Sequence, residues 1–391
     1  MRILTVLTYY RPHTSGLSIY AERLAKALVR RGHEVTVLSS QFDKSLPREE
    51  KLDGLRIVRL PVLFRVSKGV IMPSLGAVAW REMLKHDALL LHLPQFDAAG
   101  LALRGRLLKK ATVIIYHSDL TLPPGLFNRF VNSVVHLMNN LAARFAHRIS
   151  AYTEDFATHS PFLVRHAAKV KVISPAVEIP QANAADIEAF AKTHNPKKKH
   201  PVIGMATRFA AEKGVELLLE ALPRVLEEHP DAMVLFAGQY RDVMGEEAYM
   251  ARLLPTLKKF QAAGKWNFLD TLTMKEMALF YANIDLLVVP STNSTETFGF
   301  VQIEAMMNGK PVVASNLPGV RQPVKITGMG RVSPVGDSVL LGKNMIAVLS
   351  DAKKYRGDSE SLRAQFSPDA SAERHEELFE EIARELENNS E

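Results

Sequence analysis

Two glutamates, eight positions apart, are the side chains in this chain whose types and spacing best suit chemistry. Glu296 lies in a loop after an apolar run, and Glu304 falls in the first turns of a helix predicted from Phe300. Gly299 permits close approach to the backbone, and the free N–H groups at a helix start favour an anion. Two carboxylates would repel that anion but can accept hydrogen bonds from hydroxyl groups, as on a sugar or ribose. Alternatively, Glu296 complements the helix dipole and Glu304 is solvated.

Short apolar runs alternate with helical patterns along the chain. Runs at residues 3–8, 112–117 and 202–206 are rich in strand-forming residues, and segments with apolar residues at helical spacing lie between such runs. This alternation predicts an α/β protein with two doubly wound, Rossmann-like parallel sheets. Ligands of open α/β sheets bind beyond the carboxyl ends of the strands. We therefore expect the two sheets to face a cleft that holds the site.

A polar stretch with several prolines and three consecutive lysines separates the halves. It predicts an N-terminal domain over residues 1–178, a linker over 179–199 and a C-terminal domain over 200–370. Residues 371–391 form an amphipathic helical pattern with 8 acidic and 2 basic side chains, whereas residues 1–178 hold 25 Lys and Arg against 13 Asp and Glu. The opposite charges predict that this last helix crosses back onto the N-terminal domain.

The composition narrows the possible chemistry and location. The chain has 0 Cys, which excludes disulfides, iron–sulfur clusters, thiolate zinc sites and a cysteine nucleophile, and favours the reducing cytoplasm. No run approaches the ~18 apolar residues of a membrane-spanning helix, and the N-terminus predicts a buried strand rather than a signal peptide. The basic N-terminal half suggests an anionic partner, namely phosphate, acidic lipid or nucleic acid, with solubility as the alternative.

Several motifs, in order, resemble those of glycosyltransferase family 4, which are retaining enzymes with the GT-B fold. Residues 296–315 are similar to the family's donor-site signature, with seven residues between the two glutamates. Ser15-Gly16 and the following helical pattern resemble its glycine loop, and residues 207–214 resemble its basic loop. The resemblance implies transfer of a hexose from a nucleotide diphosphate sugar to a hydroxyl acceptor, such as a lipid-linked or cell-envelope glycan.

The resemblance also implies the donor-binding residues, which are Gly16, Arg208, Lys213, Glu296, Phe298, Gly299, Phe300 and Glu304. Arg208 and Lys213 would neutralise the departing diphosphate, Glu296 would hold donor-sugar hydroxyls and Glu304 the ribose hydroxyls. The sequence has no Asp-x-Asp that could hold Mg²⁺ or Mn²⁺. We therefore expect no metal and no cofactor beyond the nucleotide sugar as co-substrate. Alternatively, Arg208 and Lys213 are surface charges near the start of a helix.

His117 ends a buried strand, where the family carries its active-site histidine. With Arg208, Lys213 and Glu296 it completes the predicted catalytic set, and it would contact the donor sugar and transition state. Asp119 either orients the acceptor or caps a turn. Retention of the anomeric configuration could proceed through a carboxylate nucleophile, or by attack of the acceptor on the face from which the leaving group departs. The family resemblance favours this same-face attack. One departure is Asp270, which stands where glycine is common in the family and bears on the base pocket.

Residues 101–150 hold seven Lys and Arg against one acidic residue, and residues 127–145 have the pattern of a long amphipathic helix. This region predicts peripheral binding to the anionic inner membrane face, with a core helix under a basic surface as the alternative. Other possible functions are a nucleotide-sugar epimerase or phosphorylase of the same architecture and a nucleic-acid-binding protein. Nucleic-acid binding is disfavoured because the basic stretches lack interleaved aromatic residues. A phosphorylase is disfavoured because no motif marks a pyridoxal lysine. A nicotinamide dehydrogenase is disfavoured because no G-x-G-x-x-G follows the first strand.

Overall fold

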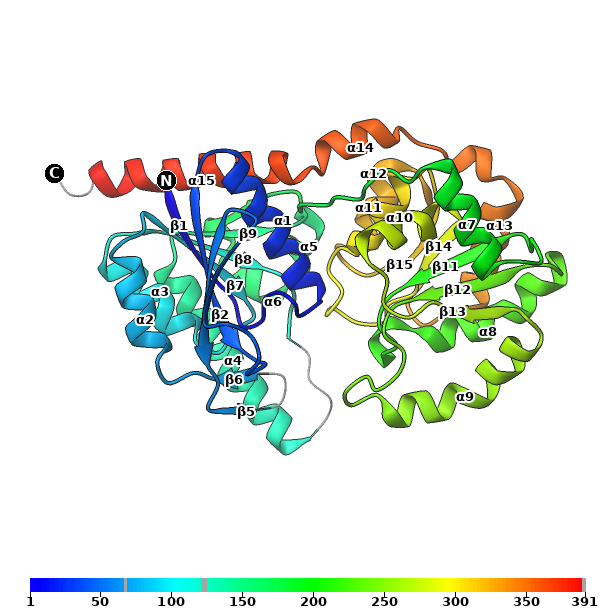
Figure 1. The fold of residues 1–391 in the computed structure, drawn as a ribbon, viewed down its shortest axis with the longest axis horizontal. Helices are drawn as coiled ribbons and strands as arrows, with labels where there is room; N and C mark the ends of the chain where they lie inside the picture. Colours follow the sequence, from blue (N-terminus) through cyan, green and yellow to red (C-terminus); the bar gives the residue numbers. More distant parts are fainter. Residues whose placement is uncertain (67–68, 121–124, 389–391) are drawn as a thin grey trace. The chain divides into compact units, whose positions relative to one another are not determined.

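The computed structural model of the protein describes residues 1–66, 69–120 and 125–388. The chain divides into two compact units (Figure 1). Unit 1 comprises Met1–Val177 and Gln365–Glu391, and unit 2 comprises Glu178–Ala364. Each unit has its own sheet of mainly parallel strands, which confirms the predicted α/β fold class.

Unit 1 contains an eight-stranded sheet in the order β10-β9-β8-β7-β1-β2-β4-β3. All neighbouring strands are parallel except β3 and β4, which are antiparallel. The strands are β1 (Arg2–Val6), β2 (Glu34–Gln41), β3 (Glu49–Leu52), β4 (Leu55–Pro61), β7 (Ala88–Leu93), β8 (Ala111–Tyr116), β9 (Arg148–Ala151) and β10 (Val170–Val172). Strands β7 and β8 are buried along their whole length, as expected for central strands of a sheet covered on both faces.

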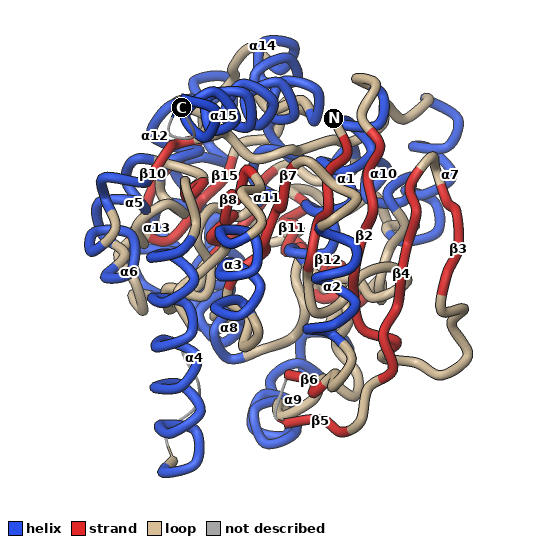
Figure 2. Tube along the Cα trace, turned by 90° about the vertical axis from the view of Figure 1, so that its left-hand side faces the viewer, coloured by secondary structure: helices blue, strands red, loops and turns tan. Residues whose placement is uncertain are grey.

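Besides one turn of 3-10 helix at Ala167–Lys169, the remaining described elements of unit 1 are α-helices and one separate pair of antiparallel strands. They are α1 (Gly16–Arg30), β5 (Phe64–Val66), β6 (Gly69–Ile71), α2 (Leu75–Met83), α3 (Ala98–Leu107), α4 (Leu126–Phe145), α5 (Glu154–His159), α6 (Pro161–Arg165) and α15 (Pro368–Asn388). Helix α4 packs along α3 at one end, and its first half extends beyond the sheet (Figure 2).

The C-terminal helix α15 lies against α1 and β8 of unit 1, as the opposite charges predict. Its apolar face buries Leu378, Phe379 and Ile382. Acidic side chains along its other faces pair with basic ones of the sheet and α1: Glu381 lies 2.7 Å from Arg148, and Asp369 lies 3.1 Å from Arg30. The last predicted helical positions, residues 389–391, lie outside the described residues.

Unit 2 contains a six-stranded parallel sheet in the order β13-β12-β11-β14-β15-β16. Its strands are β11 (Val202–Ala206), β12 (Met233–Ala237), β13 (Trp266–Phe268), β14 (Leu286–Val289), β15 (Val312–Ser315) and β16 (Gly330–Ser333). Its helices are α7 (Ala184–His194), α8 (Val215–Glu228), α9 (Glu247–Ala262), α10 (Met274–Ala282), α11 (Phe300–Met306), α12 (Gln322–Thr327), α13 (Ser338–Ser350) and α14 (Ser359–Gln365).

The segment predicted as a linker is largely folded. Residues 184–194 form α7, whose amino end is capped by the side chain of Asn183 accepting from the Asp186 amide. Phe190 is buried, and α7 packs against α10 within unit 2. Apolar periodicity could not predict this helix, because only one of its side chains is buried. The chain also returns to unit 1 at Gln365, earlier than the predicted residue 371.

Candidate active site

The loop after β11 carries Arg208 and Lys213 at the carboxyl edge of the unit 2 sheet. The Thr207 amide donates to the Ala237 carbonyl (2.8 Å) and the Phe209 amide to the Gln239 carbonyl (2.7 Å). Gly238, at φ +133°, approaches so closely that a Cβ there would lie 2.0 Å from the Thr207 carbonyl oxygen. The main chain on both sides of Arg208 is therefore held in place before any ligand arrives.

A second loop, after β14, lies directly against the first. The Thr292 amide donates to the Glu212 carbonyl (2.9 Å). Gly214, at φ +67°, leaves no room for a side chain, since a Cβ would meet the Pro290 carbonyl oxygen at 2.2 Å. This packing brings Lys213 and Glu296 together, with 2.5 Å between Nζ and Oε2. Strands β11 and β14 are neighbours, so their following loops meet at one edge of the sheet.

Arg208 does not contact Glu296 but pairs with Glu212, four residues on. The two cations therefore each face a carboxylate, and the charges of Arg208, Glu212, Lys213 and Glu296 cancel. Sequence reasoning assigned no role to Glu212, although its spacing from Arg208 was the available signal.

The start of α11 is shaped by Gly299 and Gln302. Gly299 has φ +74°, and a Cβ there would lie 2.8 Å from the side-chain amide nitrogen of Gln302. That buried amide donates to the carbonyls of Phe298 (2.8 Å) and Val320 (2.9 Å). The Phe298 ring is buried, so its side chain is not available to a ligand.

Glu304 lies one turn into α11 and is 7% exposed. The Tyr281 hydroxyl of α10 donates to its Oε2 at 2.8 Å. A carboxylate held in this way keeps a defined orientation for further hydrogen-bond donors. Tyr281 is a second residue of this site that sequence reasoning missed.

In unit 1, Gly16 is exposed and opens α1. Ser15 caps the helix: its hydroxyl accepts from the Ser18 amide (3.2 Å), and the Ser18 hydroxyl accepts from the Ser15 amide (2.8 Å). This capping box leaves the N–H groups of the first turn near Gly16 available for an anion.

His117 directly follows β8 and is 8% exposed. Its Nε2 shares a hydrogen bond with Nδ1 of His92 (2.8 Å), and its Nδ1 with the Tyr152 hydroxyl. The ring of Tyr20, from α1, lies edge-on with its centroid 5.4 Å away. Both ring nitrogens thus have protein partners, and a sugar contact through either one requires exchange of a partner. His92 and Tyr152 are further residues that sequence reasoning missed.

Burial keeps these imidazoles neutral. It lowers the pKa of His92 to about 3 and, with the neighbouring His92, lowers the pKa of His117 well below its ordinary value. The Nε2 of His92 shares a further hydrogen bond with the Thr5 hydroxyl (3.0 Å). The result is an uncharged chain of hydrogen bonds from β1 through β7 to the end of β8.

Asp119 is held by one oxygen, which accepts from the hydroxyls of Tyr116 (2.9 Å) and Ser160 (2.7 Å). Burial, and then the Asp119 charge, raise the pKa of Tyr116, so the phenol remains a donor. Asp119 therefore links the end of β8 to the start of α6, where Ser160 caps the helix.

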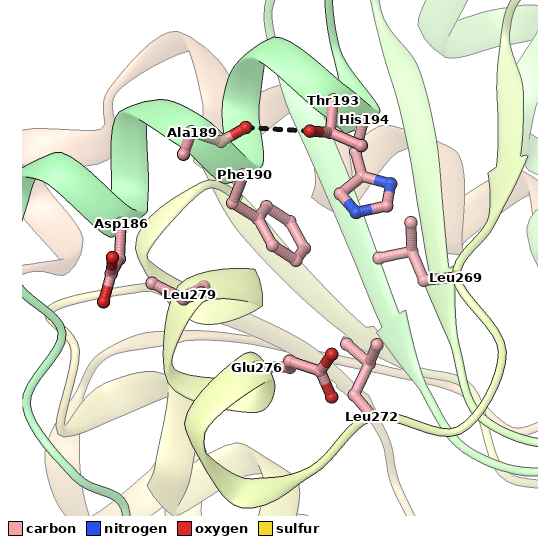
Figure 3. Close-up of a pocket in the computed structure, with 9 residues that line it drawn as sticks. All are labelled: Asp186, Ala189, Phe190, Thr193, His194, Leu269, Leu272, Glu276 and Leu279. Atoms are coloured by element: carbon pink, nitrogen blue, oxygen red, sulfur yellow. Dashed lines mark hydrogen bonds between the residues drawn. The ribbon is translucent and has the colours of Figure 1, made fainter.

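A cavity of about 340 Å³ in unit 2 lies apart from these residues. Figure 3 shows it between α7, α10 and the segment after β13. It is lined by Asp186, Ala189, Phe190, Thr193, His194, Leu269, Leu272, Glu276 and Leu279, none of which was a predicted site residue. Nearby Asp270 has φ +55°, a left-handed conformation that favours glycine.

Within residues 1–66, 69–120 and 125–388, no group of three or more His, Asp or Glu side chains is arranged to hold a metal ion. No helix in these same ranges is long and apolar enough to span a membrane.

Two family models match the chain. The model described as "Glycosyl transferase 4-like domain" matches residues 15–176, and the one described as "Glycosyl transferases group 1" matches residues 186–365. A phosphatidyl-myo-inositol mannosyltransferase of Mycobacterium tuberculosis is 25% identical over 361 residues, which cover 90% of this chain and 88% of the relative. A GDP-mannose-dependent alpha-mannosyltransferase of the same species is 27% identical over 350 residues, covering 86% and 85%.

Solved structures share the fold. Anabaena HepE in complex with UDP superposes with a TM-score of 0.77 at 21% identity, covering 97% of this chain and 100% of that chain. Sucrose-phosphate synthase from Thermosynechococcus elongatus gives a TM-score of 0.76 at 19% identity, covering 97% and 98%. The chain is therefore a glycosyltransferase of the GT4 type, with the two parallel-sheet units of the GT-B fold.

Proposed function

We propose that this glycosyltransferase moves a hexose from a nucleotide diphosphate sugar to a hydroxyl acceptor with retention of configuration and without a metal. The proposal is carried by two adjacent loops of unit 2. They place Arg208, Lys213 and Glu296 at the carboxyl edge of the sheet. As the glycosidic bond breaks, negative charge grows on the diphosphate, and cations already fixed nearby stabilise it. Glu296 and Glu304 then accept hydrogen bonds from sugar and ribose hydroxyls.

Three residues of unit 1, Gly16, His117 and Asp119, also have roles in this proposal. The N–H groups at Gly16 add to the positive field on the diphosphate, and His117 contacts the donor sugar at the transition state. Asp119, held by Tyr116 and Ser160, orients the acceptor hydroxyl. We favour same-face attack, in which the acceptor O–H proton passes to a donor phosphate oxygen while the glycosidic C–O bond breaks and the new one forms.

The donor is best sought among UDP- and GDP-hexoses. One relative is named as GDP-mannose-dependent, and HepE was solved with UDP and with UDP-glucose. Incubating the protein with a panel of nucleotide sugars and a lipid-linked glycan acceptor should release nucleoside diphosphate with one donor. Addition of EDTA should leave that release unchanged, because Arg208 and Lys213 take the place of a metal ion. Loss of release on chelation, reversed by Mg²⁺ or Mn²⁺, would contradict the metal-free mechanism.

We also propose that the acceptor lies at the cytoplasmic face of the membrane and that α4 contacts the bilayer there. Leu126, Phe127 and Phe130 of α4 are 85%, 61% and 68% exposed. Among the described residues of α4, only Asn139, Ala142 and Ala143 are buried, so the alternative of a core helix does not describe its first half. Arg129 lies on this end of α4, and further basic side chains stand at positions 104, 106, 109 and 110, on and just after α3, which packs against α4. Apolar insertion and anionic lipid attraction both favour binding there.

Co-sedimentation with vesicles tests this membrane contact. The protein should bind vesicles containing phosphatidylglycerol, bind less well as salt rises, and lose most binding in the double variant Phe127→Ser, Phe130→Ser. The matched control is Met244→Ser in unit 2, because Met244 is also 68% exposed but lies outside α4. Equal binding of the α4 variant and the wild type would remove α4 from the membrane contact.

A further inference from the structure

Glu212 neutralises the cation on which the proposed donor site depends. Its carboxylate pairs with Arg208, and its side chain is 14% exposed against 40% for the arginine. Lys213 is paired in the same way with Glu296, but Glu296 already has a proposed role toward sugar hydroxyls. Glu212 has no role in the proposed function, although its negative charge lies beside the arginine that is proposed to bind the diphosphate.

The geometry of the loop keeps Glu212 in place. Its own carbonyl accepts from the Thr292 amide at 2.9 Å, and the preceding residue, Ala211, donates its amide to the Glu246 carboxylate at 3.0 Å. A guanidinium has five N–H donors in a planar fork, of which Arg208 uses Nη2 toward Glu212. Arg208 can therefore hold a phosphate oxygen and Glu212 together, or exchange one for the other.

We propose that Glu212 competes with the nucleotide diphosphate for Arg208 and so limits how tightly the product is held. This inference rests on the proposed function. Without Glu212 the loop pair would carry a net positive charge, and a departing nucleoside diphosphate would remain bound longer. With Glu212 present, Arg208 pairs again with the Glu212 carboxylate as the nucleoside diphosphate leaves. The product therefore dissociates faster after each transfer.

The variant Glu212→Gln separates charge from position. Its amide oxygen still accepts a hydrogen bond from Arg208 but carries no charge, whereas Glu212→Ala removes both. We expect Glu212→Gln to bind UDP or GDP roughly tenfold more tightly in calorimetric titration, since one like charge near the phosphates is removed. Added salt should reduce the difference. In steady-state turnover both kcat and the KM for the donor should fall, as expected when product release slows.

The control is Glu227→Gln, which makes the same charge change at an exposed position of α8. It should leave nucleotide affinity unchanged, and melting temperatures should show that all variants are folded. If Glu212→Gln binds nucleotide as the wild type does, or more weakly, Glu212 holds Arg208 in position and the inference is wrong.

The variant Arg208→Ala distinguishes failure of the inference from failure of the proposed function. If it binds nucleotide as well as the wild type, Arg208 is not a phosphate ligand, and the proposed function and this inference both fail. If it binds more weakly while Glu212→Gln shows no gain, the inference alone fails.

Discussion

Replacing Arg208 with alanine should lower kcat/KM for the nucleotide sugar by about 10²–10³, the loss typical when one preorganised group that stabilises transition-state charge is removed. The main chain on both sides of Arg208 is fixed against the end of β12 by hydrogen bonds at Thr207 and Phe209, and the guanidinium pairs with Glu212. Lys213 cannot compensate, because it lies five positions on and is paired with Glu296. The kinetic loss should exceed any change in stability, since a partly exposed ion pair contributes little to folding.

The measurement is steady-state kinetics beside thermal unfolding. Arg224→Ala is the control, because Arg224 is an exposed arginine of α8 outside both loops. We expect it to keep wild-type activity. If Arg208→Ala lost activity only in proportion to a fall in melting temperature, Arg208 would have a structural role and the proposed mechanism would be wrong.

Acid should destabilise unit 1 before its carboxylates titrate. Burial lowers the pKa of His375 on α15 to about 4 and that of His92 to about 3, from an ordinary value of 6.5. The unfolded chain then binds more protons than the folded one between pH 6.5 and those values, so stability is full above pH 6.5 and falls as the pH drops. A shift of this size corresponds to about 3 kcal/mol for His375 alone.

Melting temperatures measured from pH 8 to pH 4.5 test this. We expect a plateau above pH 7 and a steady fall below pH 6.5, and a shallower fall in His375→Gln. His375 is fully buried and donates from Nδ1 to the Ser371 carbonyl at 2.7 Å, so this variant should also melt lower at pH 8. A flat profile for the wild type down to pH 5 would mean that these histidines are protonated in the folded protein.

The fold could be predicted because its signals are local. Continuous apolar runs gave the central strands, and the opposite charges of residues 371–391 and the first half gave the position of α15. Two of the elements that were missed have weak signals: β3 has the sequence EEKL with no fully buried residue, and α7 buries only Phe190. For α4 the periodicity predicted a helix correctly, but periodicity carries no information about what covers its apolar face.

The site could be predicted in part. The motif spacing placed Glu296, Gly299 and Glu304 around the start of α11, as observed. The contact between Lys213 and Glu296 joins residues 83 positions apart and depends on β11 and β14 being neighbours, which a single sequence does not state. His92 lies at the end of β7 beside β8, so its contact with His117 could have been anticipated only once the strand order was known.

Unit 1 is assembled from two separated stretches of chain, whereas unit 2 is one continuous stretch. During synthesis from the amino end, residues 178–364 emerge before α15 does. Unit 2 can therefore complete its sheet on the ribosome while the basic face of α1 and Arg148 of β9 still lack their acidic partners. Unit 1 lacks one of its elements until α15 is made, so a translation product interrupted before α15 would contain the complete sheet of unit 2 and an unfinished unit 1.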